Sequence, residues 1–235
     1  MKKKIQFDID NVVSKLTIKA NEYKTPIVEL IEAQTKEPWK VLIATILSAR
    51  TTDTITSLVT TKLFKKIKTI IDFRHFSTTE IEKMIYPIGF YRNKAKFLHA
   101  LPDVLQKLFN GRIPDSVDEL VKLPGVGRKT ANLVVAVGFH KPAICVDTHV
   151  HRIMNIWGYV QTKTPFETEM ALRSTLPECH WITVNYLLVS HGQSICRPVS
   201  PHCDECVINE ECPKINVKPR KLPLKKPLSS SDKNH

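Results

Sequence analysis

The residues with the clearest chemical potential lie between positions 123 and 151. A Leu-Pro-Gly-Val-Gly-Arg-Lys string ends on Lys129, and Asp147 follows after an apolar run and a short link that contains Pro142. A neutral lysine amine can attack an electrophilic carbon and form a Schiff base, and a nearby carboxylate can stabilise positive charge or move a proton. This pattern predicts a nucleophilic pair. The simpler alternative is a phosphate contact for Lys129 and a helix N-cap for Asp147.

A glycine hairpin precedes the lysine. Gly125 and Gly127 interrupt the helical pattern, which restarts immediately afterwards. Two helices joined in this way would leave the backbone N–H groups of Val126, Gly127 and Arg128 unpaired at a helix N-terminus, where an anion binds favourably. Glycine also allows a ligand's backbone to come close. The hairpin is therefore predicted to bind nucleic-acid phosphate.

Four cysteines near the C-terminus are spaced Cys-x6-Cys-x2-Cys-x5-Cys. Thiolates from one short loop can surround either a tetrahedral zinc ion or a cubane iron–sulfur cluster. Zinc sites usually combine two well-separated Cys-x2-Cys pairs, and this loop has one, so the spacing favours the cluster without excluding zinc or an empty loop. The four residues are Cys196, Cys203, Cys206 and Cys212. Cys145 and Cys179 stand in apolar surroundings and are expected to be buried free thiols.

The elements that must position these residues are helices. Apolar residues recur three or four positions apart along most of the chain, and no alternating strand pattern is present, which predicts an all-α fold. A buried central helix is expected from Pro38, residues 26–37 are an unclear connector, and Pro102 should bend or split a long helix. Capping boxes are expected at Ser77 with Glu80, Ser116 with Glu119 and Thr164 with Glu167.

The charge of the chain indicates a polyanionic partner. Its 235 residues carry a formal net charge of +12 and have a pI of about 9.4, which favours nucleic acid. No apolar run is long enough to span a membrane, and no secretory signal is evident. A cytoplasmic monomer with reduced cysteines is expected, associated with the nucleoid if the source is prokaryotic. Residues 217–235 are rich in Lys, Pro and Ser and are expected to be a disordered basic tail.

The hairpin, Lys129, Asp147 and the cysteine spacing together resemble the endonuclease III family of helix–hairpin–helix DNA glycosylases. The resemblance implies that Lys129 is the nucleophile, that Asp147 is its electrostatic partner, and that the cysteines hold a 4Fe–4S cluster. It also implies two lobes with DNA between them. Residues 31–141 would form a helical lobe with the hairpin, and residues 1–30 plus 142–216 would form the cluster lobe.

Two further loops carry the resemblance. Residues 46–53, Ile-Leu-Ser-Ala-Arg-Thr-Thr-Asp, resemble the family's loop that fills the gap left by a flipped nucleotide, with Arg50 where glutamine is usual. Arg50 can only donate hydrogen bonds to the orphaned base. Phe90 resembles an apolar wedge between base steps, its alternative being a core aromatic. DNA contacts are accordingly expected from Arg50, Phe90, Gly125, Val126, Gly127, Arg128 and His149.

The resemblance implies a base-excision repair enzyme acting on double-stranded DNA. Its expected substrates are oxidised pyrimidines and abasic sites, the latter cleaved by β-elimination. One rival is a monofunctional mismatch glycosylase that removes adenine, or thymine or uracil opposite guanine. The presence of Lys129 argues against the adenine-specific type, whereas Arg50 leaves the thymine-specific type open. Another rival is a non-catalytic DNA-binding protein that uses the iron–sulfur cluster as a scaffold.

Overall fold

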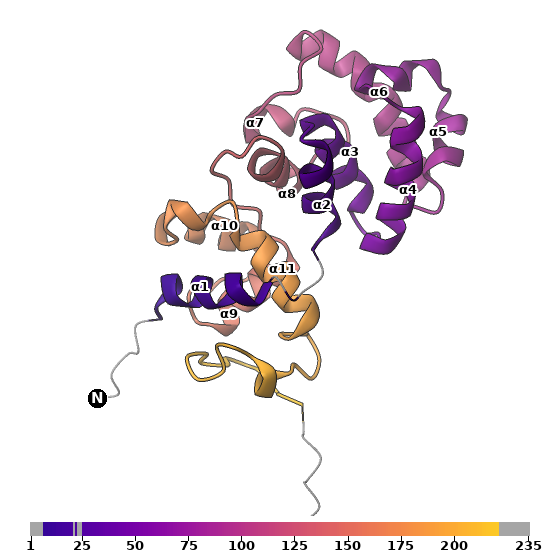
Figure 1. Ribbon diagram of the computed structural model, residues 1–235. Coiled ribbons are helices and arrows are strands. Elements are labelled where there is room, and N and C mark those ends of the chain that lie inside the picture. The colour runs from indigo at the N-terminus through magenta and orange to yellow at the C-terminus, as the bar shows by residue number, and fades with distance from the viewer. Residues whose placement is uncertain (1–6, 21, 23–24, 221–235) are drawn as a thin grey trace, which may run out of the picture.

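A computed structural model describes residues 7–20, 22 and 25–220, and in these residues the chain is helical and has no strand (Figure 1). The all-α prediction is confirmed. The α-helices are α1 (Ile9–Ala20), α2 (Ile27–Thr35), α3 (Pro38–Ser48), α4 (Asp53–Lys66), α5 (Thr78–Ile85), α6 (Tyr91–Phe109), α7 (Val117–Leu120), α8 (Arg128–Leu133), α9 (Thr148–Ile156), α10 (Pro165–Thr175) and α11 (Val184–Ser194). The shorter elements are the 3₁₀ turns η1 (Ile70–His75), η3 (Glu178–His180) and η4 (Cys203–Glu205) and the π-helical turn η2 (Val134–Gly138).

Figure 1 shows two lobes, one containing α2 to α8 and the other containing α1, α9, α10 and α11. The first lobe is built around α3, whose residues Val41 to Leu47 are all buried because the helix is apolar nearly all round. In the second lobe α1 packs beside α11 and α9, around the fully buried Trp157. The N-terminal helix therefore shares a core with the C-terminal third of the chain. The assignment of residues to domains remains a prediction.

A helix occupies the segment that gave no clear sequence pattern. In α2, Ile27, Val28 and Ile31 are buried against Val41 and Ala44 of α3. Leu133, Val137 and Cys145 belong to the same apolar cluster, so this helix lies where the chain passes from the first lobe to the second. Pro26 stands at its N-cap position, and Lys36 in the left-handed conformation ends it. Burial of one short face explains why the segment had too few apolar positions to be recognised.

Of the three expected capping boxes, only that of Ser77 and Glu80 is complete. The hydroxyl of Thr164 accepts the N–H of Glu167, but the carboxylate of Glu167 accepts the N–H of Lys163, one residue before the cap. The hydroxyl of Ser116, by contrast, donates to the side chain of Glu119 at 2.8 Å and caps no backbone N–H. Helix α6 runs unbroken through Pro102, because its apolar face is fully buried in the core and compensates for one missing backbone hydrogen bond.

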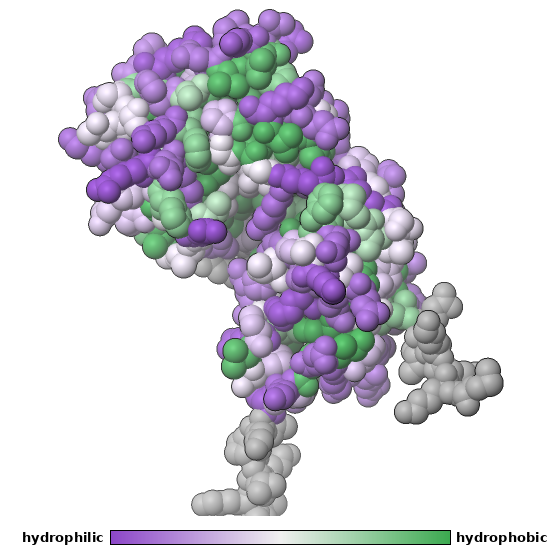
Figure 2. All heavy atoms as spheres, turned by 180° about the vertical axis from the view of Figure 1, so that it is seen from behind, coloured by the Kyte–Doolittle hydropathy of each residue, from purple (hydrophilic) through white to green (hydrophobic). Residues whose placement is uncertain are grey.

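The surface bears on partners in two ways. Seen from behind, the outline narrows between the lobes, and hydrophilic side chains cover much of both (Figure 2). None of the described helices is both long and apolar enough to cross a bilayer.

The start of the expected tail makes contacts: the N–H of Arg220 donates to the carbonyl of Pro201, and its guanidinium pairs with Asp204 and Glu205. Residues 221–235, the rest of the expected tail, lie outside the described residues.

Candidate active site and cysteine loop

Lys129 and Asp147 come together as the sequence spacing suggested. The Nζ atom of Lys129, in the first turn of α8, lies 3.9 Å from Oδ2 of Asp147, which precedes α9. The lysine side chain is 58% exposed and the aspartate side chain 10%. An amine that reaches out from a helix beside a largely buried carboxylate can approach a ligand while the carboxylate keeps its position. The free protein supplies little desolvation of the lysine, so a bound ligand would have to add it.

The two carboxylate oxygens of Asp147 have different partners. Oδ1 accepts the backbone N–H groups of His149 and Val150, each at 2.9 Å, which makes Asp147 the N-cap of α9. Oδ2 is the oxygen that faces Lys129. The N-cap reading and the reading as an electrostatic partner are therefore both compatible with the structure. The cap fixes the carboxylate rotamer, so Oδ2 is held toward the amine without a further side chain.

The pair lies on the wall of a pocket of about 180 Å³. Elements of both lobes contribute to the wall, including α2, the end of α3, the start of α4, α8, α9 and α11. Its polar side chains are Glu29, Ser48, Asp53, Lys129, Asp147, Thr148, His149, Asn185 and Gln193. A pocket with an amine, three carboxylates and several amide and hydroxyl groups can bind a polar planar group beside a nucleophile.

Glu29 was not anticipated. It comes from α2, the segment without a clear pattern, and no motif spacing marks it. The pKa of its carboxyl is raised to about 7, chiefly by burial and also by the carboxylates of Asp53 and Asp147, while its own backbone N–H and Lys129 act in the opposite direction. Only the tertiary structure brings this side chain to the pocket, so no local pattern could identify it.

The hairpin differs from expectation in one of its three donors. The N–H of Val126 donates to the carbonyl of Leu123 at 3.2 Å, so the expected free donors reduce to Gly127 and Arg128. Gly125 has a φ of +76°, and a Cβ there would lie 2.6 Å from Phe97. A Cβ on Gly127 would meet nothing within 4 Å. Gly125 is therefore required by the fold, whereas Gly127 leaves open space in front of the helix terminus.

The Arg128 side chain is occupied within the protein. Its guanidinium makes a bidentate pair with Glu169 of α10, with distances of 2.9 Å from both Nε to Oε2 and Nη2 to Oε1, and it lies over the ring of Phe166. Glu169 also pairs with Arg173 and is 6% exposed. The pair raises the pKa of Arg128. The prediction of a DNA contact at Arg128 therefore depends on its backbone N–H.

The two expected DNA-probing loops contact each other. The Arg50 guanidinium lies 5.2 Å from the ring centroid of Phe90, which is 58% exposed. The N–H of Gly89 donates to the hydroxyl of Thr51, and a Cβ on Gly89 would approach the Arg50 carbonyl to 2.4 Å. Phe90 is thus a surface residue and not a core aromatic. The loops form one exposed unit in which Arg50 and Phe90 are neighbours.

Buried Lys94 supports the loop that carries Arg50 through hydrogen bonds to its backbone. Its Nζ donates to the carbonyls of Leu47 and Ala49, at 2.8 and 2.6 Å. These carbonyls belong to the end of α3, where helix geometry leaves them without intrahelical partners. Burial lowers the pKa of Lys94 to about 8. Nothing in the local sequence indicates that this lysine supports the loop that carries Arg50.

His149 lies on the pocket wall and packs closely against α11. Its Nδ1 is 3.4 Å from Nη2 of Arg152, and a Cβ on Gly192 would come within 2.5 Å of the ring. Burial lowers the pKa of His149 despite the opposing charge of Asp147. His149 is therefore neutral at pH 7. His151, two residues on, is turned toward Thr168 instead, at 2.7 Å.

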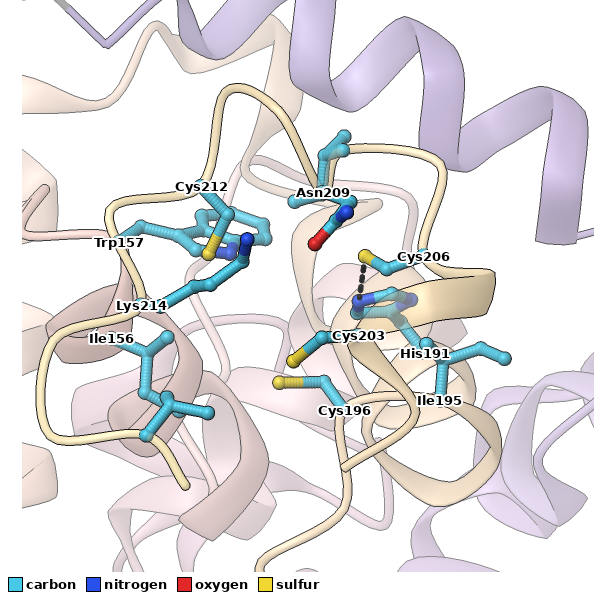
Figure 3. A pocket seen from close by; sticks show the side chains of 12 residues that line it. Ile156, Trp157, His191, Ile195, Cys196, Cys203, Cys206, Asn209, Cys212 and Lys214 are labelled. Atoms are coloured by element: carbon cyan, nitrogen blue, oxygen red, sulfur yellow. Dashed lines mark hydrogen bonds between the residues drawn. The ribbon is translucent and has the colours of Figure 1, made fainter. Parts of the chain in front are cut away.

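The four C-terminal cysteines line one cavity (Figure 3). Its wall is otherwise mostly apolar, and Cys203, Cys206 and Cys212 come from a loop that has no α-helix of its own. Burial raises the pKa of Cys196 and Cys212, and that of Cys206 to about 11. Within the described residues, no three potential ligands are close enough to hold a single metal ion.

Arg152 and His191 lie against the cysteines of this cavity. Nη1 of Arg152 is 3.7 Å from Sγ of Cys196, and Nε2 of His191 is 3.7 Å from Sγ of Cys206. The positive charge of Arg152, together with Lys214 on the cavity wall, offsets part of the negative charge that thiolates bring, so the surroundings fit an anionic iron–sulfur group. Of the two cysteines outside the loop, Cys145 is buried as expected, but Cys179 is exposed in η3. That short turn lies at the surface, so its local apolar composition was misleading.

Comparison with known proteins places this site in a family. Residues 43–178 match the model of the HhH-GPD superfamily base excision DNA repair proteins. Endonuclease III of Thermotoga maritima is 46% identical over 176 residues, which cover 75% of this chain and 83% of the relative. The chain belongs to the endonuclease III family. It is thereby assigned to the DNA N-glycosylases with AP lyase activity, as the resemblance carried by the hairpin, Lys129 and Asp147 implied.

Other family members differ in length or are known as complexes. Endonuclease III-like protein 1 of Gallus gallus is 40% identical, with 74% of this chain and 63% of the relative covered, so this chain spans less than two-thirds of that protein. A solved non-covalent endonuclease III–DNA complex superposes with a TM-score of 0.78 at 35% identity, covering 88% of this chain and 94% of that one. The two-lobed helical arrangement is therefore a family property.

Proposed function

We propose that this enzyme removes oxidised pyrimidines from double-stranded DNA with Lys129 as the nucleophile, and then cleaves the resulting abasic site. The observation that carries the proposal is the 3.9 Å approach of Lys129 Nζ to Asp147 Oδ2 on the wall of a pocket large enough for a planar base. The neutral amine attacks the sugar carbon C1′, the bond from C1′ to the base breaks, and the base leaves with the bonding electrons.

Asp147 acts on the charge that develops in this step. Its Oδ2 is held beside the amine by the cap on α9, so it can stabilise positive charge on the sugar as the base departs. The same oxygen can accept a proton from the nitrogen once that nitrogen is bonded to C1′. The C1′–O4′ bond of the sugar ring then breaks as the C1′=N bond of the Schiff base forms, and O4′ takes up a proton. Loss of a proton from C2′ to solvent next expels the 3′-phosphate, which breaks the strand.

Binding to DNA is proposed to use the hairpin and the two loops. The open space before Gly127 suits a phosphate at the start of α8. The exposed Arg50–Phe90 pair suits the gap left when a nucleotide is rotated out of the duplex. Arg50 would hydrogen-bond the orphaned base and Phe90 would wedge between neighbouring bases. DNA that carries a damaged base or an abasic site is the proposed partner.

A 4Fe–4S cluster is the proposed occupant of the cysteine cavity. Cys196, Cys203, Cys206 and Cys212 would hold it, and bound iron would keep their sulfurs as thiolates. The group would supply a covalent cross-link for a loop that contains little regular structure. Iron and acid-labile sulfide in equal amounts in the purified protein would support this proposal, whereas stoichiometric zinc would refute it.

Borohydride trapping tests the catalytic proposal. The protein is incubated with a duplex that contains an abasic site, and borohydride reduces any Schiff base to a stable adduct. The wild type and Lys122→Gln, a control at an exposed lysine in the same hairpin, should give the adduct, and Lys129→Gln should give none. An adduct that persists in folded Lys129→Gln would refute the assignment. Release of thymine from a G·T duplex without an adduct would point to a mismatch glycosylase.

A further inference from the structure

Glu29 enters the active-site pocket from an element that has no part in the hairpin or in the Lys129–Asp147 pair. Helix α2 is anchored by its neighbours: Ile27, Val28 and Ile31 are buried in the apolar cluster between the lobes. Glu29 lies off that buried face and lines the pocket together with Lys129 and Asp147. The backbone that carries this carboxyl is therefore fixed, and Glu29 lines the pocket to which the proposed function assigns the flipped base.

The surroundings of Glu29 differ from those of Asp147. Asp147 accepts two backbone N–H groups through Oδ1, which holds its carboxyl in place. Among the described residues no side chain donates a hydrogen bond to Glu29, and it shares the pocket with the carboxylates of Asp53 and Asp147. Burial and these like charges raise the pKa of Glu29 to about 7. The pocket thus holds one carboxyl that is fixed by backbone N–H donors and another, that of Glu29, that is suited to carry a proton.

The other titratable groups facing the pocket are less suited to donate a proton. His149 is neutral at pH 7 and its Nδ1 faces Arg152. Lys129 must itself be neutral to attack. Asp53, the first residue of α4, also lines the pocket. The segments of α3 and η2 that pack against α2 bring no charged side chain to this pocket.

We propose that Glu29 is the general acid that protonates the departing base. Building on the proposed function, the Lys129 amine forms its bond to C1′ as the bond between C1′ and N1 of the pyrimidine breaks. The electron pair of the broken bond goes to the base, and the Glu29 carboxyl delivers its proton to that base. Asp147 takes the proton that the lysine nitrogen loses, so the charges balance. Cleavage of an abasic site has no departing base and does not need this proton.

This difference defines the experiment. Single-turnover rates are measured for base release from a duplex containing 5-hydroxyuracil and for strand cleavage at a preformed abasic site, with the cluster-loaded full chain. Glu29→Gln should slow base release by roughly 10²-fold or more at pH 7, since general acids contribute about 10²–10⁴-fold. Strand cleavage should stay within about threefold of the wild type. Glu32→Gln, one turn along α2 and paired with His140, is the matched control and should alter neither rate.

The pH dependence separates an acid from a structural residue. Because the protonated form is the active one, the wild-type base-release rate should fall as the pH rises through about 7. This limb should disappear in Glu29→Gln, and the defect should shrink for a base that forms a more stable anion. Unchanged base release in Glu29→Gln would overturn the proposal, as would equal loss of both reactions. A wild type that cleaves abasic sites but releases no base would refute both this proposal and the proposed glycosylase function.

Discussion

Two substitutions at Asp147 should separate its structural role from its chemical one. Asparagine keeps an oxygen that can accept the N–H groups of His149 and Val150, but it removes the charge that faces Lys129. Alanine removes both. Asn and Asp are nearly equivalent N-caps, whereas alanine at such a position costs about 0.5–2 kcal/mol. We therefore expect Asp147→Asn to unfold close to the wild type and Asp147→Ala to unfold at a temperature lower by roughly 2–8 °C.

The catalytic effect follows from the 3.9 Å separation between Lys129 Nζ and Asp147 Oδ2. At this distance the Asp147 carboxylate and a unit positive charge that develops on the nitrogen as it bonds to C1′ attract by about 1 kcal/mol in water. At an effective dielectric constant of about 20 they attract by about 4 kcal/mol. The lysine is 58% exposed in the free protein, so the smaller value applies there. Bound DNA excludes water and moves the interaction toward the larger value. The gain of about 3 kcal/mol corresponds to roughly 10²-fold in rate.

The assay pairs single-turnover kinetics with thermal unfolding for the wild type and both variants. We expect both variants to lose about 10²-fold in rate, and only Asp147→Ala to lose stability as well. A wild-type rate in Asp147→Asn would refute the electrostatic reasoning, because this variant keeps the geometry of the side chain but has lost its charge. Equal unfolding temperatures for the alanine variant and the wild type would refute the capping role.

Two further predictions concern residues that support the site. Arg128→Ala should destabilise the fold by about 1–3 kcal/mol in urea unfolding, because it leaves the buried Glu169 with one of its two arginine partners, and affinity for undamaged DNA should change little. In the wild type, the pKa of Lys94 is about 8 in the fold against an ordinary value near 10.5, so the unfolded chain binds more protons between these values. Stability should therefore rise with pH across that window relative to Lys94→Met, and an identical pH slope in the two proteins would contradict the burial argument.

The features that could be predicted from the sequence are those whose chemistry is local. Asp147 is followed by the helix it caps, and the four cysteines lie within one short loop, so chain spacing fixes both arrangements. The buried helix from Pro38 is apolar over consecutive turns, which leaves no alternative to the core. In each case the interacting groups are close along the chain, so the spacing of the residues in the sequence predicts the contact.

Contacts between segments that are distant along the chain could not be predicted from any local sequence pattern. Arg128 pairs with Glu169, 41 positions away, and Lys94 reaches the carbonyl of Leu47 across 47. Neither residue differs in type from an ordinary surface charge, so a basic residue beside a DNA-binding hairpin was expected to contact DNA. Glu29 belongs to the same category, because its environment is created by side chains from other helices.

The division of the pocket between the lobes has a consequence for catalysis. Lys129 belongs to the hairpin lobe, Asp147 caps a helix of the other lobe, and Glu29 stands on the helix between them. A ligand that closes the pocket must contact elements of both lobes, so desolvation of the amine and placement of the two carboxyls occur together. The exposure of the lysine in the free protein follows from this requirement. A pocket that kept the amine neutral by permanent burial would be closed to a nucleotide rotated out of a duplex.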